Sequence, residues 1–380
     1  MAGYRKYFIW FSFIFAVFFG LNLFLSKFVF LPVYYFSGDK EAKVVMIKEK
    51  GPTHLKTPDA VRAIYLTSYT AGFIQRRDEL IKFAEESEIN SMVIDIKDYS
   101  GRIAFEMDDS EIINLGSIEK RILDIKEFIG ELHKKNIYAI GRIVVFQDPY
   151  LAKIRPDLAV KNKKGGVWLD HKGIAWLDPT KKDVWDYHIK IARQAEKAGF
   201  DELNFDYVRF PSDGKMENME YPIKPNTQEG RVAALESFFK YLKTELAGLK
   251  IPLSVDLFGF IATETNDLNI GQVLEKAEPY FDYIAPMVYP SHYPKNYNNF
   301  KNPAEHPYEI IFEAMTTAAD RLIKASSTPA KLRPWIQDFD LGATYNAEMI
   351  KKEKQAIYDA GLRSWMAWDP SNKYTREAYK

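Results

Sequence analysis

The sequence predicts a (β/α)8 barrel, or TIM barrel, preceded by an N-terminal membrane-spanning helix. Two observations favour this architecture: an uncharged apolar run opens the 380-residue chain, and after it short apolar runs alternate with longer amphipathic ones. Eight short runs over about 310 residues match the strand number and length of such a barrel. They begin at Ala63, Ser91, Tyr138, Glu202, Pro252, Phe281, Leu332 and Gly361.

The first segment, residues 1–36, is interpreted as a transmembrane anchor. Its uncharged run of 19 residues, Tyr7–Leu25, is long enough for one spanning helix, and Arg5 and Lys6 before it favour an N-terminus inside the cell. A cleaved signal segment is the alternative, although its apolar core is usually shorter and no A-x-A pattern stands near Leu25. A buried core helix is a further alternative. The predicted location is the cell membrane, single-pass with the barrel extracytoplasmic, or a secreted barrel if the segment is cleaved.

The rest of the chain divides into a polar tether over 37–60 and a barrel over 61–380. The tether is mostly charged and polar and contains two prolines. In the barrel, Gly or Asn leads from a helix into a strand in AGFDEL, AGLRSW and KKNIYAI. A doubly wound sheet is the alternative, but it would more often carry a Gly-rich phosphate loop after its first strand, which TSYTAG matches poorly.

Composition excludes several classes of function. Lys and Arg number 52, as do Asp and Glu, so the chain lacks the basic surplus typical of a nucleic-acid binder. It contains no Cys, which excludes disulfides and thiolate metal sites. Its six His form neither H-x-H nor H-E-x-x-H, and no Ser nucleophile elbow is present. No metal or other cofactor is therefore predicted.

Polar and aromatic residues gather at the predicted strand ends, where the active sites of TIM barrels lie. They come from seven of the eight strands, which is hard to explain by packing alone. They are Asp95, Lys97, Asp98, Arg142, Asp206, Arg209, Asp256, Tyr289, Gln337, Asp338, Trp368 and Asp369.

The stretch GFDELNFDYVRFPSDG places Asp206 near the end of a strand with apolar neighbours. Because strand residues alternate between faces, Asn204 and Asp206 share one face, and Asp256 is expected beside Asp206 on the next strand. Two adjacent carboxyl groups raise the pKa of one of them, and glycoside hydrolysis uses such a pair as acid and as nucleophile or base. In the structural alternative, Arg209 or Arg142 pairs with Asp206 and Asp256 caps the next helix.

Two further clusters are candidate substrate contacts. In DIKDYSG, Asp95 and Lys97 are expected to share a face and to hold a sugar hydroxyl together with Asp98, or else to form a plain ion pair and a turn. In APMVYPSHY, Tyr289 faces inward, and His292 follows in a loop where a solvated imidazole is the alternative.

Tryptophans supply two candidate sugar platforms. Trp368, at the end of the last strand in SWMAWDP, is a candidate for stacking against a sugar, with core packing as the alternative. The long loop KNKKGGVWLDHKGIAWLDP contains Trp168 and Trp176. We expect Trp176 to line a substrate groove, and a loop folded on itself is the alternative.

Four motifs, GFDELNFDYVRFPSDG, WLDP, APMVYPSHY and WIQDF, together resemble the bacterial putative glycoside hydrolase family of TIM barrels. The resemblance spans about Val61 to Tyr374. It implies a carbohydrate-active barrel.

A fainter resemblance links the chain to chitinase-type barrels, which carry D-x-x-D-x-D-x-E on strand four. Asp201 and Asp206 match the first and third Asp of that pattern, whereas Asn204 replaces the second and Val208 stands at the acidic Glu. A substrate-assisted mechanism driven by that Glu is therefore not supported, and Asp256 is the candidate acid.

The same resemblance extends to two later strands. Met287 and Tyr289 match the Met-x-Tyr of strand six, and Trp368 stands where those barrels carry a Trp on strand eight.

The leading hypothesis is a membrane-anchored extracytoplasmic glycoside hydrolase that acts on a polysaccharide or envelope glycan through a carboxylate pair. A non-catalytic carbohydrate-binding barrel is the second hypothesis. The third is a structural protein of the cell envelope, which the anchor alone would explain.

Overall fold

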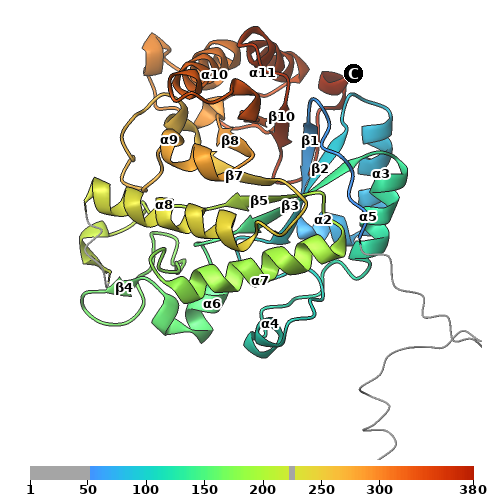
Figure 1. Ribbon diagram of the computed structural model, residues 1–380. Helices are drawn as coiled ribbons and strands as arrows, with labels where there is room; N and C mark the ends of the chain where they lie inside the picture. The colour runs from blue at the N-terminus through green and yellow to red at the C-terminus, as the bar shows by residue number, and fades with distance from the viewer. Residues whose placement is uncertain (1–51, 222–226) are drawn as a thin grey trace, which may run out of the picture. The chain divides into compact units, whose positions relative to one another are not determined.

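Eight parallel strands close a barrel in the computed structural model, which describes residues 52–221 and 227–380 (Figure 1). Each predicted run contributes one strand, so the barrel prediction is confirmed and the doubly wound alternative is wrong. Around the barrel the order is β1-β2-β3-β5-β7-β8-β9-β10, and β10 pairs with β1. The strands are β1 (Arg62–Leu66), β2 (Ser91–Lys97), β3 (Tyr138–Val144), β5 (Glu202–Asp206), β7 (Leu253–Phe258), β8 (Tyr283–Met287), β9 (Trp335–Gln337) and β10 (Trp365–Trp368).

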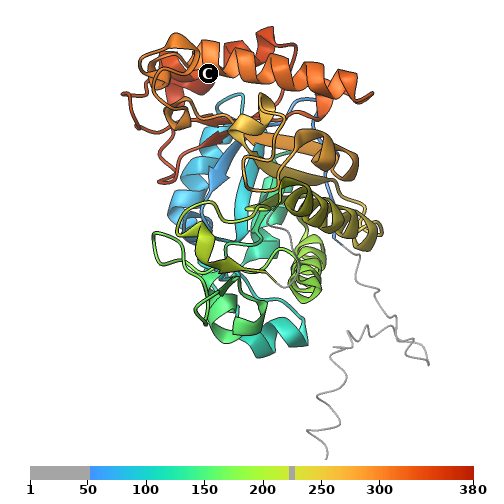
Figure 2. The ribbon, with the colours of Figure 1, turned by 90° about the vertical axis from the view of Figure 1, so that its left-hand side faces the viewer.

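Helices lie outside the strands, as the two perpendicular views show (Figures 1 and 2). They are α2 (Ser68–Gly72), α3 (Ile74–Glu85), α4 (Ser110–Leu115), α5 (Ile125–Lys134), α6 (Pro149–Ile154), α7 (Lys182–Ala198), α8 (Gln228–Glu245), α9 (Leu274–Ala277), α10 (Pro307–Lys324) and α11 (Ala347–Asp359). A two-stranded antiparallel sheet of β4 (Lys161–Asn162) and β6 (Met219–Glu220) stands apart from the barrel.

The predicted membrane helix, Tyr7–Leu25, lies outside the described residues. Among residues 52–221 and 227–380, no helix is long and apolar enough to cross a membrane.

Left-handed residues connect helices to strands where the sequence predicts it. Gly199, with φ of 109°, caps α7 before β5, and Gly361, with φ of 80°, precedes β10. Asn136, with φ of 57°, precedes β3. Glycine and asparagine adopt this conformation more readily than other residues.

The apolar core has two layers, because successive strand residues face opposite ways. On β1, Ile64 and Leu66 pack outward against the helices, whereas Ala63 and Tyr65 point into the barrel. The inner layer is small and carries the polar groups of the site at its upper end.

The N-terminal end of the barrel is closed by polar contacts and by residues before β1. The Leu55 amide donates to Asp201 Oδ1 at 2.7 Å, and the Thr57 hydroxyl lies 3.0 Å from the Tyr138 hydroxyl. The compact unit that contains the barrel therefore begins at Pro52, within the predicted tether. Asp201 also accepts the Ala139 amide at 2.8 Å, so this acid of the chitinase-like pattern serves the closed end.

A buried ion pair lies deeper in this end of the barrel. Arg333 Nη1 is 2.7 Å from Glu202 Oε1 and 2.9 Å from Oε2, and neither residue is more than 1% exposed. The Tyr138 hydroxyl donates a further hydrogen bond to Glu202 at 3.2 Å.

Removing one partner of this pair is expected to destabilise the barrel strongly. Arg333→Met would leave the Glu202 carboxylate buried without its cation, and we expect the free energy of unfolding to fall by about 3–5 kcal/mol in urea titrations. The double variant Glu202→Met/Arg333→Met should lose less, because no uncompensated charge remains. Equal losses in the single and double variants would contradict this account.

Candidate active site

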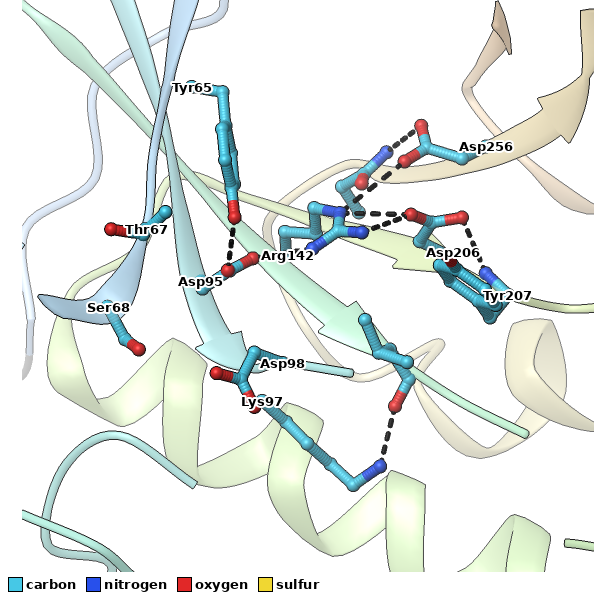
Figure 3. A network of polar contacts seen from close by, with 12 residues as sticks. Tyr65, Thr67, Ser68, Asp95, Lys97, Asp98, Arg142, Asp206, Tyr207 and Asp256 are labelled. Atoms are coloured by element: carbon cyan, nitrogen blue, oxygen red, sulfur yellow. Dashed lines mark hydrogen bonds and ion pairs between the residues drawn. The ribbon is translucent and has the colours of Figure 1, made fainter. Parts of the chain in front are cut away.

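Arg142, on β3, is the centre of a buried polar network (Figure 3). Its Nη1 donates to Asp95 Oδ1 at 2.6 Å, and its Nε donates to Asp206 Oδ2 at 3.0 Å, with Nη2 donating to the same oxygen. The same Nε lies 3.9 Å from Asp256 Oδ2. Three strands therefore turn their acids toward one guanidinium, and Arg142, not Arg209, is the ion-pair partner of Asp206.

Asp206 is the last residue of β5, and both of its oxygens are occupied. Oδ2 accepts from Arg142, and Oδ1 accepts the backbone N–H of Tyr207 at 2.5 Å. This amide reaches the carboxylate because Tyr207 has a φ of 52°, in the left-handed region that bulky residues rarely adopt. Such strain at a strand end is typical of functional sites. These contacts stabilise the carboxylate form of Asp206.

Asp256, on β7, has the opposite environment. Its Oδ1 accepts from Asn204 Nδ2 at 2.9 Å and from Trp335 Nε1 at 2.7 Å, whereas its buried Oδ2 has no hydrogen-bond partner. Burial, and then the negative charge of Asp206, hold the pKa of the Asp256 carboxyl well above its usual range. Two donors on Oδ1 mark it as the carbonyl oxygen, which assigns the proton to Oδ2. The helix-capping alternative for Asp256 is wrong.

The two acids are close enough to act as a pair. Arg142 Nε lies 3.0 Å from Asp206 Oδ2 and 3.9 Å from Asp256 Oδ2, so these oxygens are at most about 7 Å apart. Paired carboxyl groups in glycoside hydrolases are roughly 5–9.5 Å apart.

Asp95 lies behind Arg142 and orients it. It accepts from the Tyr65 hydroxyl at 2.5 Å as well as from Arg142. Burial raises the pKa of the Asp95 carboxyl to about 6, against the lowering effect of Arg142. Tyr65 in turn stacks on Trp368 with ring centroids 3.9 Å apart.

A cavity of about 260 Å³ opens over the acid pair. Seven of the predicted site residues line it: Arg142, Asp206, Arg209, Asp256, Tyr289, His292 and Trp368. The other lining residues are Tyr207, Phe258, Gly259, Phe260, Gln272, Met287, Tyr293 and Trp335. The walls are thus largely aromatic and the floor is charged, an arrangement that suits a ligand with apolar faces and polar edges.

Several lining residues were missed by sequence reasoning. Strand alternation alone would have placed Phe258 beside Asp256, and Trp335 on the face of Gln337. Phe260 and Tyr293, whose rings lie 4.6 Å apart, follow strand ends and carry no periodic signal. Gly259 also lines the cavity because a Cβ there would lie 2.3 Å from Met287 O.

The prediction that Asp95 and Lys97 share a face is wrong. The register with β3 shifts between them, because β2 carries one extra residue at a bulge. Lys97 is consequently turned away from Arg142, as Figure 3 shows, and is fully buried with its Nζ 2.8 Å from Asp148 Oδ2 and 2.7 Å from Val144 O. It cannot reach a ligand in the cavity.

Asp98 also has a structural role, so its predicted substrate contact is corrected. It lies 2.5 Å from Arg121 Nη1 and accepts the Ser100 amide at 3.0 Å. The alternative of a plain ion pair and a turn describes this segment.

Three predicted residues near the ends of β9 and β10 hold loops and lie outside the cavity lining. Gln337 accepts from the Ser291 hydroxyl at 2.8 Å and thereby fixes the loop that carries His292. Asp338 accepts the Thr375 amide at 3.0 Å, and Asp369 accepts the Ser371 amide at 2.5 Å. Asn204 supports the site from below through Asp256.

Trp176 does not form an open groove wall, because it is only 2% exposed. Its Nε1 donates to Asp170 Oδ2 at 3.1 Å, so the loop folds on itself as the alternative proposed. One face of its ring supports Arg209, whose guanidinium carbon lies 4.7 Å from the ring centroid.

Within the described parts of the chain, no group of three or more His, Asp or Glu is arranged to hold a metal ion. The absence of a metal or other cofactor stays a prediction.

The fold and the site together define a (β/α)8 barrel with a candidate acid pair beneath an aromatic cavity at the C-terminal ends of its strands. The chain belongs to the family described as putative glycosyl hydrolase domain, whose model matches residues 63–374. The resemblance drawn from the four motifs is thereby confirmed.

Solved structures agree on the fold. The glycoside hydrolase domain of PgaB (BpsB) from Bordetella bronchiseptica matches with a TM-score of 0.62 and 13% identity, covering 84% of this chain and 99% of that one. The C-terminal domain of a putative chitinase from Desulfitobacterium hafniense matches with a TM-score of 0.51 and 9% identity, over 84% and 94% of the two chains. A hypothetical protein from Ruminiclostridium thermocellum is 35% identical, over 51% of this chain and 96% of that one, with a TM-score of 0.47. No curated protein matches the sequence.

The raised pKa of Asp256 should make stability depend on pH. The folded state holds this proton more tightly than the unfolded state, so the contribution is full below about pH 4 and is lost as pH rises toward the folded pKa. Relative to Asp256→Asn, the wild-type free energy of unfolding should fall by up to about 1.4 kcal/mol per pH unit in that window. Urea titrations of both proteins at several pH values measure the difference. A difference that stays constant or rises with pH would contradict the assignment.

Proposed function

We propose that the barrel is a glycoside hydrolase in which Asp256 is the general acid and Asp206 is the nucleophile or base. The proposal depends chiefly on the contrast between these two carboxyl groups: Asp206 is neutralised by Arg142, whereas Asp256 is buried, has no ion-pair contact shorter than 3.9 Å and carries a proton. Two titratable groups whose environments separate their pKa values are the usual basis of acid–base assignments.

In the proposed reaction, the glycosidic oxygen receives the proton of Asp256 Oδ2 as the bond to the anomeric carbon breaks. The Asp206 carboxylate either attacks the anomeric carbon or removes a proton from an attacking water. Asn204 and Trp335 hold Asp256 Oδ1, so the proton stays on the oxygen nearer Asp206 and Arg142. The partly exposed Trp368 ring on the cavity wall is a surface on which a sugar can stack.

A non-catalytic carbohydrate-binding barrel is the second candidate, and one observation favours it. Both oxygens of Asp206 are already engaged, by Arg142 and by the Tyr207 amide, and Arg142 must release one contact for Asp206 to act as a nucleophile. The experiment on the acid pair separates the two candidates.

Substitution of either acid should abolish turnover. We expect Asp206→Asn and Asp256→Asn each to lower the rate of reducing-sugar release from a panel of envelope and plant glycans by about 10²–10⁴-fold, because each removes an acid–base or nucleophilic group. The control Asp320→Asn changes an exposed acid on α10 and should keep wild-type activity. Glycan binding without turnover in the wild type would sink the hydrolase and leave the binding barrel.

We propose in addition that residues 1–36 anchor the barrel in the cell membrane, with the barrel outside. The support is the uncharged run of 19 residues preceded by Arg5 and Lys6. An envelope or extracellular glycan would be the accessible substrate in that location.

Fractionation of cells tests the anchor. The full chain should stay in the membrane pellet after an alkaline carbonate wash and be digested by protease added outside the membrane, whereas a chain that begins at residue 37 should not reach the pellet. Recovery of the full chain in the medium, shortened at its N-terminus, would show a cleaved signal segment instead.

A further inference from the structure

Arg209 is a cation on the cavity wall without an acidic partner. No carboxylate of the described residues lies within 4.0 Å of its guanidinium, in contrast to Arg142, which contacts three. Its only hydrogen bonds come from Nη1, to Phe210 O and Ser212 Oγ, both at 3.1 Å.

The other edge of the Arg209 guanidinium is free. Nε and Nη2 have no hydrogen-bond partner among the described residues, and neither is fully shielded from solvent. These two N–H groups form the fork that binds both oxygens of a carboxylate. The Trp176 ring, 4.7 Å from the guanidinium carbon, holds the fork in place.

The charges of the site do not balance without a ligand. Arg142 is neutralised by Asp95 and Asp206, and Asp256 is protonated, so the charge of Arg209 is the one left over on the cavity lining. Burial lowers the pKa of the Arg209 guanidinium, which shows that more distant acids such as Asp213 do not compensate its desolvation. An anion in the cavity would supply the missing charge.

We propose that the cavity takes an acidic glycan and that the Arg209 fork binds a carboxylate carried by the sugar. This inference rests on the proposed function and names the class of its substrate. The carboxylate can belong to the ring of a hexuronic acid or to an acidic ether such as a lactyl group, and the two sources present the same chemistry to Arg209.

The test compares acidic oligosaccharides with their carboxyl-reduced counterparts, which keep the ring and the linkage but carry CH2OH in place of the carboxylate. The probes are oligomers of galacturonate, glucuronate and mannuronate for the ring carboxylate, and peptide-free peptidoglycan oligosaccharides for the lactyl group. Binding to the full-length chain in detergent is measured by calorimetry, and reducing-sugar release is followed in parallel.

We expect at least one acidic oligosaccharide to bind about 10- to 100-fold more tightly than its reduced counterpart, the effect of one charged bidentate contact. Arg209→Gln should remove this preference. The control Lys172→Gln, an exposed lysine in the loop that carries Trp176, should retain it. Because the measured quantity is a ratio of affinities, a general loss of folded protein does not imitate the result.

Three results would overturn the inference: equal or tighter binding of the reduced forms, a preference that survives in Arg209→Gln, or no binding of any acidic probe. Turnover of neutral glycans without this preference would leave the hydrolase standing and remove the acidic substrate. Binding that depends on Arg209, without turnover by the wild type, would do the reverse.

Discussion

The ion pairing of Arg142 inside the barrel determines the chemistry of the site. A guanidinium that is only 4% exposed must be compensated, and Asp95 and Asp206 do so from the two flanking strands. The third acid, Asp256, approaches no closer than 3.9 Å and therefore remains in an environment that favours its neutral form. One cation thus separates two chemically identical side chains into a charged one and a protonated one.

Aromatic residues of the barrel interior fix this polar network in place. Trp335 donates to Asp256, and Trp368 lies with its ring 5.0 Å from the Arg142 guanidinium. Tyr65 joins the two parts, since it stacks on Trp368 and donates to Asp95. The same side chains fill the barrel and orient its polar groups, so packing and electrostatics at the site are not separable.

The strands could be predicted from the sequence because each is a short apolar run between amphipathic stretches, a signal that survives without knowledge of neighbours. The inward direction of Asp206 and Asp256 followed from alternation on regular strands. Lys97 was misplaced because a bulge shifts the register without leaving a mark in the local sequence. Trp176 and Asp338 were misassigned for another reason, namely that contacts within loops and with the C-terminal segment decide their burial. The choice of Arg142 over Arg209 as partner of Asp206 depended on side-chain reach across strands, which spacing does not encode.

The bulge in β2 has a consequence for how such a site can change during evolution. By one inserted residue, the strand delivers an acid to the interior and a lysine to the layer beneath the helices, where Asp148 receives it. Loss of that residue would restore strict alternation and bring an amine inward beside the guanidinium. The polarity of the interior is therefore controlled by strand length as much as by residue identity, and a single-codon deletion could reverse the ligand charge that the barrel selects.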